Sequence, residues 1–357
     1  MSCAQSPAAV SRGALATDLS ALQLTLRPLR ALLQDENITE LCINRPGEVC
    51  IETAMGWRYE PLPAADYQWC SRLAKLVANA THQRVDETSP LLSGWLPGGE
   101  RLQLVFPPAT CAGRIAISIR RPATTVWSID ELAAQGSLLV TRRAQNSLDS
   151  TDLELRRLLQ RQQYQDFLRL AVRARRNILV SGPTGSGKTT WTKALIREIP
   201  SDERLITIED SQELVLDRHP NHVRLLYSKD DQGLSRVTPK QLLECCLRMR
   251  PDRILLAELR SEEAFDYLRC LNSGHPGSIT SIHAASAELA LEQLVLLVKQ
   301  SSGGRELSRR EIKQLLYLLV DVIVQCGIEH HRRFIREIWF EPERRLRNQS
   351  RLTRDRR

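Results

Sequence analysis

The chain has 357 residues, of which 42% are hydrophobic and 26% charged, a composition typical of a globular protein long enough for two domains. No apolar stretch reaches the ~20 residues that span a bilayer, and residues 1–17 lack the pattern of a secretory signal. Nine cysteines without a Cys-x-x-Cys pair argue against a disulfide framework or a structural zinc site, and predict mostly buried thiols in a reducing cytoplasm.

The net charge of +8 is unevenly distributed along the chain. The last 27 residues contain ten arginines against four acidic residues, a net charge of +6. A basic tail of this kind can contact nucleic acid or an anionic membrane surface. The favoured interpretation is a solvated, partly disordered end, and whether the tail binds lipid stays open at this stage.

Residues 1–125 are predicted to form a small α+β domain behind a loose arm over 1–20. Alternating and helical apolar spacings predict a helix over 21–33, strands over 38–44, 49–52 and from Trp57, a helix over 67–81, and strands over 101–106 and 114–119. Residues 126–166 follow as a predicted linker, with a short helix over 128–134 and a charged helix over 152–163.

Residues 167–357 are predicted to form an α/β domain with a parallel sheet, because strands alternate with helices. The expected strands cover 177–180, 205–208, 222–226, 253–257 and 278–282. Ser308 and Glu311 fit a capping box that opens a helix through Leu319. Residues 320–325 and 333–339 are predicted to pair as a hairpin around Gly327.

A Walker A phosphate-binding loop lies between a predicted strand and a predicted helix over 190–198. Glycines let the backbone lie against a phosphate, and the loop N–H groups together with the helix dipole attract it. Lys188 is expected to reach the β- and γ-phosphates, and the Thr189 hydroxyl to bind Mg²⁺. The predicted nucleotide-binding residues are Gly182, Pro183, Thr184, Gly185, Ser186, Gly187, Lys188, Thr189 and Thr190.

Two acidic stretches follow predicted strands, where an open α/β sheet binds its ligands. Glu209 follows the strand over 205–208 and is predicted to assist in holding Mg²⁺ through water or to orient the attacking water, which makes it a catalytic candidate as well. Glu258 follows four apolar residues in a Walker B pattern, and we expect it to lie beside the metal and to polarise the attacking water. Glu209 and Glu258 therefore join Thr189 as the predicted metal-site residues.

His275 and His283 frame the predicted strand over 278–282. A single histidine is more often structural than catalytic, but the position of His283 after a strand of the nucleotide-binding sheet favours a functional role. His330 and His331 lie in a predicted turn without such a context and are interpreted as surface residues.

Together these motifs resemble the secretion-superfamily traffic ATPases, and most closely the hexameric ATPase of bacterial type IV secretion and conjugation systems. The resemblance rests on the Walker A loop, the acidic box 208–213, the segment 248–260 and the histidine box 274–284. It implies a RecA-like ATPase domain, ATP and Mg²⁺ as ligands, and a ring of six subunits at the cytoplasmic face of the inner membrane. It also implies that His283 senses the γ-phosphate and that Arg101 and Arg120 clamp it from the N-terminal domain.

The resemblance further implies partners among the other inner-membrane ATPases and components of a type IV secretion system. The long linker is similar to a subgroup in which the N-terminal domain docks on a neighbouring subunit. Pro276 departs from the family pattern after His275 and stiffens that loop.

The predicted function is Mg²⁺-dependent ATP hydrolysis that powers secretion-system assembly or the transfer of DNA or protein. Three alternatives remain at this stage: a type II secretion or pilus-assembly motor, a DNA-stimulated RecA-like translocase, and a nucleotide-gated scaffold that hydrolyses slowly. The absence of a four-cysteine module favours the type IV prediction over the pilus-assembly motor.

Overall fold

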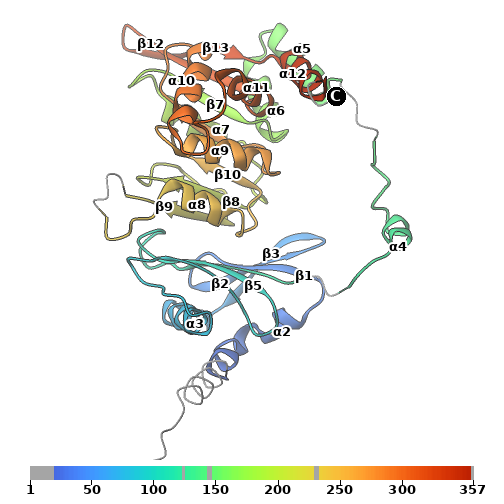
Figure 1. Cartoon of the computed structure of the whole chain (residues 1–357), viewed down its shortest axis with the longest axis vertical. Helices are drawn as coiled ribbons and strands as arrows, with labels where there is room; N and C mark the ends of the chain where they lie inside the picture. Colours follow the sequence, from blue (N-terminus) through green and yellow to red (C-terminus); the bar gives the residue numbers. More distant parts are fainter. Residues whose placement is uncertain (1–19, 123–124, 143–146, 229–232, 355–357) are drawn as a thin grey trace, which may run out of the picture.

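The computed structural model describes residues 20–122, 125–142, 147–228 and 233–354, with side chains to residue 348. The predicted arm over 1–20 lies almost entirely outside the described residues. An N-terminal and a C-terminal domain pack against each other, and the segment that connects them runs along one side of the molecule (Figure 1). Among the described helices, none combines the length and apolar composition that a membrane crossing requires.

The N-terminal domain is a six-stranded antiparallel sheet in the order β3-β2-β1-β6-β5-β4. Its strands are β1 (Ile38–Ile43), β2 (Gly47–Thr53), β3 (Gly56–Leu62), β4 (Leu91–Trp95), β5 (Arg101–Val105) and β6 (Ala116–Arg120), preceded by η1 (Arg27–Leu29) and α2 (Arg30–Gln34). The helix α3 (Tyr67–Ala80) buries Leu73 and Val77 in the same apolar cluster as the sheet. The strand β4 was not predicted from the sequence. Gly94 lets this strand approach Val77 of α3 closely.

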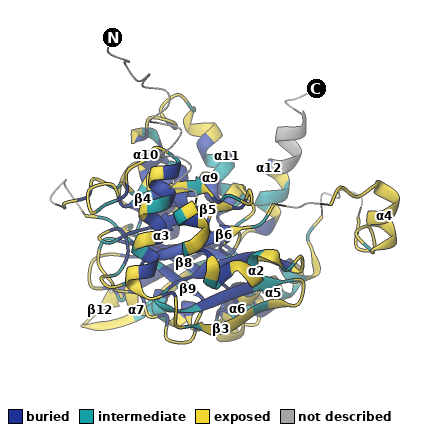
Figure 2. Ribbon diagram, turned by 90° about the horizontal axis from the view of Figure 1, so that it is seen from below, coloured by how far each residue is buried: buried dark blue, intermediate teal, exposed yellow. Residues whose placement is uncertain are grey.

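The connecting segment contains two helices with different surroundings. The predicted helix over 128–134 is found as α4 (Ile129–Ala134), with a capping box formed by Ser128 and Glu131. All residues of α4 are exposed (Figure 2). The next helix, α5 (Ser150–Gln160), lies in the predicted linker 126–166, yet it buries Leu155 and Leu158 against α6 (Tyr164–Arg173) in the core of the C-terminal domain.

The C-terminal domain contains the predicted parallel strands in two adjoining sheets. One has the order β10-β8-β9, from β10 (Arg253–Leu256), β8 (Leu205–Glu209) and β9 (His222–Leu226). The other has the order β11-β7-β12-β13, from β11 (Ile279–Ile282), β7 (Ile178–Ser181), β12 (Val322–Glu329) and β13 (Arg332–Trp339). Ser278 and Ser281 bridge the two sheets, because their hydroxyls donate to the carbonyls of Ile254 and Ala257 at 2.6 and 2.8 Å.

The strands β7, β8, β10 and β11 are buried along their whole length, and helices cover both sheets (Figure 2). They are α7 (Lys188–Ile196), α8 (Pro239–Cys246), α9 (Glu263–Asn272), α10 (Ala287–Gln300), α11 (Arg309–Leu319) and α12 (Pro342–Arg354). The capping box of Ser308 and Glu311 is confirmed at the start of α11. The hairpin is also confirmed, but its turn is His330–His331 rather than Gly327, because these two histidines adopt positive φ angles of 47° and 64°.

The arginine-rich end of the chain is helical and partly anchored, which differs from a purely solvated tail. Arg345 of α12 pairs with Asp152 and with Asp321, the latter at 2.6 Å. The guanidinium of Arg344 lies 4.0 Å from the ring centroid of Tyr317. At least two of the ten arginines therefore stabilise the fold rather than presenting free charge.

The two domains meet around Arg204, whose side chain is fully buried. Its guanidinium donates to Asn44 at 2.7 Å and to Ser118 at 3.2 Å in the N-terminal domain, and to the Met249 carbonyl at 2.9 Å in its own domain. Arg250 forms a bidentate ion pair with Glu52 nearby, at 2.5 and 3.2 Å. These contacts place the N-terminal sheet at the amino ends of β8, β9 and β10.

Candidate active site

The Walker A loop begins where β7 ends at Ser181 and finishes at the first turn of α7. Gly185 and Gly187 have φ angles of +76° and +91°, which favour glycine, and Gly187 is the N-cap of α7. A Cβ on Gly182 would lie 2.8 Å from the carbonyl oxygen of Cys326 in β12, so this position excludes a side chain. The predicted strand–loop–helix arrangement is therefore present.

The ammonium group of Lys188 links the loop to neighbouring strands. It donates to the carbonyls of Gly182 and Pro183 at 2.9 and 3.2 Å, and lies 3.2 Å from Nδ1 of His283, just beyond β11. Nε2 of His283 lies 2.8 Å from Glu258, which follows β10. Burial lowers the pKa of Lys188, and the charge of Glu258 opposes that shift. The fold thus brings Lys188, His283 and Glu258 into one chain of contacts at the strand ends where the sequence placed Glu258 and His283.

Within the acidic box, Glu209 does not face the site in the way predicted. The carboxylate of Glu209 is fully buried and accepts hydrogen bonds from the Thr207 hydroxyl at 2.6 Å and from the backbone N–H groups of Glu213 and Leu214 at 2.9 Å. The predicted role of Glu209 as a metal ligand is corrected, because its oxygens hold the following loop in place. Two other residues of the same box, Asp210 and Glu213, line a cavity beside the Walker A loop instead.

A cavity of about 210 Å³ lies beside the Walker A loop. Its oxygen-bearing walls include the hydroxyls of Thr189 and Thr192 and the carboxylates of Asp210, Glu213 and Glu258. The buried hydroxyl of Thr192 has no hydrogen-bond partner among the described residues. Hydroxyl and carboxylate oxygens are the ligands that Mg²⁺ prefers, so these residues fit a magnesium ion bound together with phosphate. Among the described residues, no group of three or more His, Cys, Asp or Glu side chains could hold a metal ion by itself, at this cavity or elsewhere.

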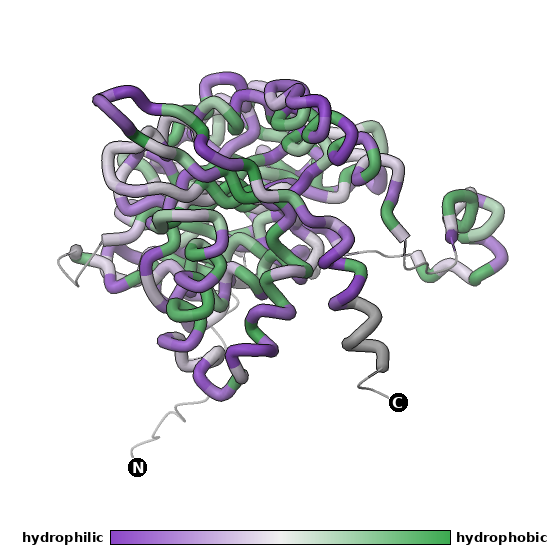
Figure 3. Tube along the Cα trace, turned by 90° about the horizontal axis from the view of Figure 1, so that it is seen from above, coloured by the Kyte–Doolittle hydropathy of each residue, from purple (hydrophilic) through white to green (hydrophobic). Residues whose placement is uncertain are grey.

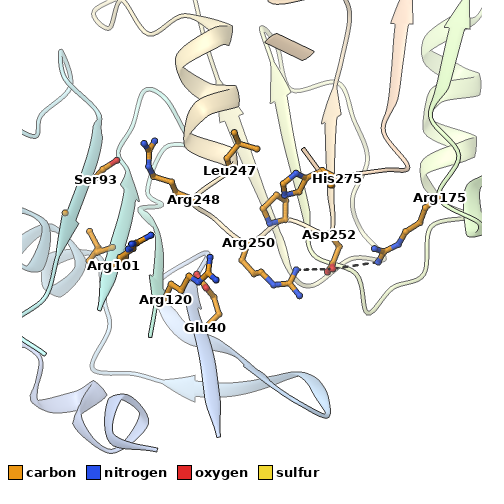
Figure 4. A pocket seen from close by; sticks show the side chains of 14 residues that line it. Glu40, Ser93, Arg101, Arg120, Arg175, Leu247, Arg248, Arg250, Asp252 and His275 are labelled. Carbon is orange, nitrogen blue, oxygen red and sulfur yellow. Dashed lines mark hydrogen bonds and ion pairs between the residues drawn. The ribbon is translucent and has the colours of Figure 1, made fainter. Parts of the chain in front are cut away.

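Arg101 and Arg120 lie in a different cavity of the same chain, about 520 Å³ in volume, between the domains (Figure 4). They are cross-strand neighbours at the ends of β5 and β6, and Arg248 faces them from the C-terminal domain. None of these three arginines forms an ion pair with another described residue. Arg101 and Arg120 line a cavity separate from the one beside the Walker A loop, so the structure does not bring them to the loop of their own chain.

His275 lines this second cavity as well, because it precedes β11 whereas His283 follows it. The two histidines therefore lie at opposite ends of one strand, and only His283 contacts the Walker A lysine. His330 and His331 are exposed, as expected. Sequence reasoning missed Arg260, which pairs with Glu258 and lies 3.3 Å from Asp210, although the arginine follows Glu258 by only two residues.

A Walker A loop whose lysine is linked to an acidic residue after a neighbouring parallel strand defines a P-loop nucleoside triphosphatase. Comparison with known proteins narrows this class. Residues 25–328 match the family model described as Type II/IV secretion system protein. The chain belongs to this family, as the resemblance predicted, and it is an ATPase.

Individual relatives match over almost the whole chain. A type IV secretion system protein VirB11 from Brucella suis is 47% identical over 322 residues, covering 89% of both chains. The protein of the same name from Bartonella henselae is 45% identical over 340 residues, covering 92% of this chain and 95% of its own. The crystal structure of the Brucella suis VirB11 ATPase in complex with sulphate superposes with a TM-score of 0.90, covering 95% of this chain and 99% of that one.

Proposed function

We propose that this protein is a Mg²⁺-dependent ATPase that works as a ring of six subunits and powers type IV secretion, through assembly of the system or transfer of DNA or protein. The observation that carries the proposal is the contact chain from Lys188 through His283 to Glu258 at the Walker A loop. High identity to type IV secretion proteins over nine-tenths of the chain supports the biological role.

The residues of the site divide the chemistry among them. Lys188 and the loop N–H groups bind the phosphates, with the dipole of α7 adding positive potential. Glu258 orients and polarises the attacking water, and His283, in contact with both Lys188 and Glu258, senses the γ-phosphate. Thr189, Asp210 and Glu258 would hold Mg²⁺, directly or through water, and the ion supplies charge neutralisation at the phosphate oxygens when bound.

Arg101 and Arg120 act, in this proposal, on the nucleotide of a neighbouring subunit. Both guanidinium groups face a cavity away from their own Walker A loop and have no carboxylate partner within ion-pair distance among the described residues. An arginine supplied from another chain neutralises transition-state charge as an arginine finger does. Assembly is therefore required for a complete site.

The linker supports assembly for an independent reason. Val126, Ile129, Leu139 and Val140 are each at least 79% exposed in one short segment. This segment lies away from both domains of its own chain (Figure 3). Exposed apolar stretches of this kind are typical of surfaces that are covered in an assembly. We propose that a neighbouring subunit of the ring covers them.

The direct test is ATPase activity with a mixing control. Lys188→Ala should abolish turnover while leaving the thermal unfolding profile unchanged, since the hydrogen-bond partners of the ammonium group among the described residues are two loop carbonyls and His283. Arg101→Ala should be inactive as well. If the arginines act between chains, a site is complete wherever an Arg101→Ala subunit, with its intact Lys188, receives the intact Arg101 of a neighbouring Lys188→Ala subunit. An equal mixture that assembles at random then restores activity at about a quarter of the interfaces. Mixed samples that stay inactive despite subunit exchange would refute action in trans.

The kind of motor is tested by adding DNA or lipid to the purified protein. Oligomer-linked ATPase activity that anionic vesicles modulate and DNA leaves unchanged supports a secretion motor peripheral to the inner membrane. Strong stimulation by DNA would instead favour a translocase that acts directly on DNA. ATP-dependent partner binding that survives Glu258→Gln would favour the scaffold alternative.

A further inference from the structure

The β12–β13 hairpin reaches the Walker A loop from outside the cavity. β12 runs parallel to β7, with Val324 and Gln325 paired to Val180 and Ser181. Past that point the chain of β7 turns into the loop, whereas β12 continues to Glu329 and returns as β13. The hairpin therefore projects beyond the sheet at the loop, and its exposed tip is hydrophilic (Figures 1 and 3).

Arg333, near the start of β13, makes the contact between hairpin and loop. Its Nε donates a hydrogen bond to the carbonyl oxygen of Gly185 at 2.9 Å. Its methylene stem lies over Gly187, where an added Cβ would be 3.3 Å from Cδ of Arg333. One side chain thus contacts Gly185 and Gly187, two of the three glycines of the loop that have positive φ angles. Residue 333 lies beyond the part of the chain that the family model matches.

The hydrogen bond fixes the orientation of a peptide group. A trans peptide is planar, with its carbonyl and N–H on opposite sides. When Arg333 holds the Gly185 carbonyl on the outer side, the N–H of Ser186 is directed to the inner side of the loop. Consistent with this, that N–H donates to the Pro183 carbonyl across the loop at 3.3 Å. Inward N–H groups are what a phosphate-binding loop requires.

We infer that Arg333 is a positioning residue that pre-organises the Walker A loop for phosphate and couples the conformation of the β12–β13 hairpin to the nucleotide. The inference rests on the proposed ATPase site, because it assigns Arg333 a role in nucleotide affinity. Coupling is reciprocal, so a hairpin that stabilises the nucleotide-binding loop is itself stabilised by nucleotide. The hairpin tip is exposed, and a subunit or partner that contacts it can then respond to the nucleotide state.

The first test separates nucleotide affinity from catalysis. Arg333→Gln removes the charged donor from the outer side of the loop without touching the cavity. The loss of one charge-assisted hydrogen bond at an exposed position predicts a rise of about fivefold in KM for ATP and in Kd for a fluorescent ADP analogue, with kcat changed less than twofold. Arg332→Gln is the matched control, since it removes the same charge from the same tip and has no contact with the loop.

The second test measures the coupling without using activity. Amide hydrogen exchange of residues 326–334 should slow when saturating ADP is added to the wild-type protein. In Arg333→Gln the nucleotide should still protect the Walker A loop at saturation, but no longer the hairpin. Equal protection of the hairpin in the variant and the wild type would overturn the inference. Failure of the wild-type protein to bind any nucleotide would instead contradict the proposed ATPase function.

Discussion

The fully buried guanidinium of Arg204 connects the two domains, and replacing it tests how they are held together. Arg204→Met keeps the aliphatic stem and removes every polar contact. Three acceptors lose a donor: Oδ1 of Asn44, Oγ of Ser118 and the carbonyl of Met249. Asn221 also loses the arginine but keeps the amide of Asn44 at 3.0 Å. The sequence analysis did not predict this network.

The magnitude follows from these orphaned groups. A buried acceptor left without a partner costs about 1 kcal/mol or more; because Ser118 keeps the Cys42 thiol at 3.6 Å, the acceptors of Asn44 and Met249 predict a loss of about 2 kcal/mol in the free energy of unfolding. An opposing effect exists, because Arg204 has no carboxylate within ion-pair distance among the described residues and its burial in the wild type is itself unfavourable. We expect the loss of hydrogen bonds to dominate, since neutral partners surround most of the guanidinium.

The assay is urea denaturation together with small-angle scattering in water. Arg204→Met should unfold at lower urea, and its radius of gyration should increase as the N-terminal domain separates from β8 and β9. Arg197→Met serves as control, because Arg197 is exposed in the same domain and its side chain forms no hydrogen bond or ion pair to the N-terminal domain among the described residues, so a change below about 0.5 kcal/mol is expected. Unchanged or raised stability of Arg204→Met would refute the reasoning and show that the desolvation cost of the guanidinium cancels its hydrogen bonds.

Three further changes test other parts of the fold. Burial raises the pKa of Glu40 to about 7 from 4.5, so the contribution of this carboxyl to stability is greatest at low pH and falls as the pH rises from 4.5 to 7. Glu40→Gln should therefore raise the Tm at pH 8, where the gain in the free energy of unfolding is up to about 3 kcal/mol, and leave the Tm unchanged at pH 4. An equal Tm shift at both pH values would contradict this prediction. Glu209→Ala should free the loop that follows it and cost about 2 kcal/mol, measured by denaturation and by faster amide exchange in that loop; unchanged exchange would argue against its positioning role. Arg345→Met leaves the buried Asp321 without its ion pair and should lower the free energy of unfolding, measured by urea denaturation, by about 3 kcal/mol. The exposed Arg347→Met is the control and should change it little, so equal small losses in both variants would mean that α12 is not anchored through this pair.

Much of the site could be predicted from sequence because its parts are local. The Walker A spacing places Lys188 and Thr189 at the start of a helix after a strand, wherever that unit lies in the fold. Glu258 and His283 were predicted for a related reason. Each follows a parallel strand, and the carboxyl ends of parallel strands meet at one edge of the sheet. Periodicity also located most of the strands and helices to within a few residues.

Other features depended on contacts that sequence spacing does not encode. Glu209 and Asp210 are adjacent in the chain, and only the packing of the loop decides that Glu209 is turned inward to hold backbone N–H groups while Asp210 faces the cavity. The placement of Arg101 and Arg120 depends on how the domains dock, which Arg204 and its partners fix across more than a hundred residues of sequence.

The phosphate-binding chemistry could be predicted from local sequence, since a continuous stretch with its own backbone geometry carries it. Which distant groups meet that stretch depends on how the chain folds. Arg333 reaches the Gly185 carbonyl because β12 happens to pair with β7, and Arg101 faces away from its own loop because the N-terminal sheet docks at the opposite strand ends. Such contacts result from the pairing of strands and the burial of side chains across the whole chain, so a local pattern cannot specify them.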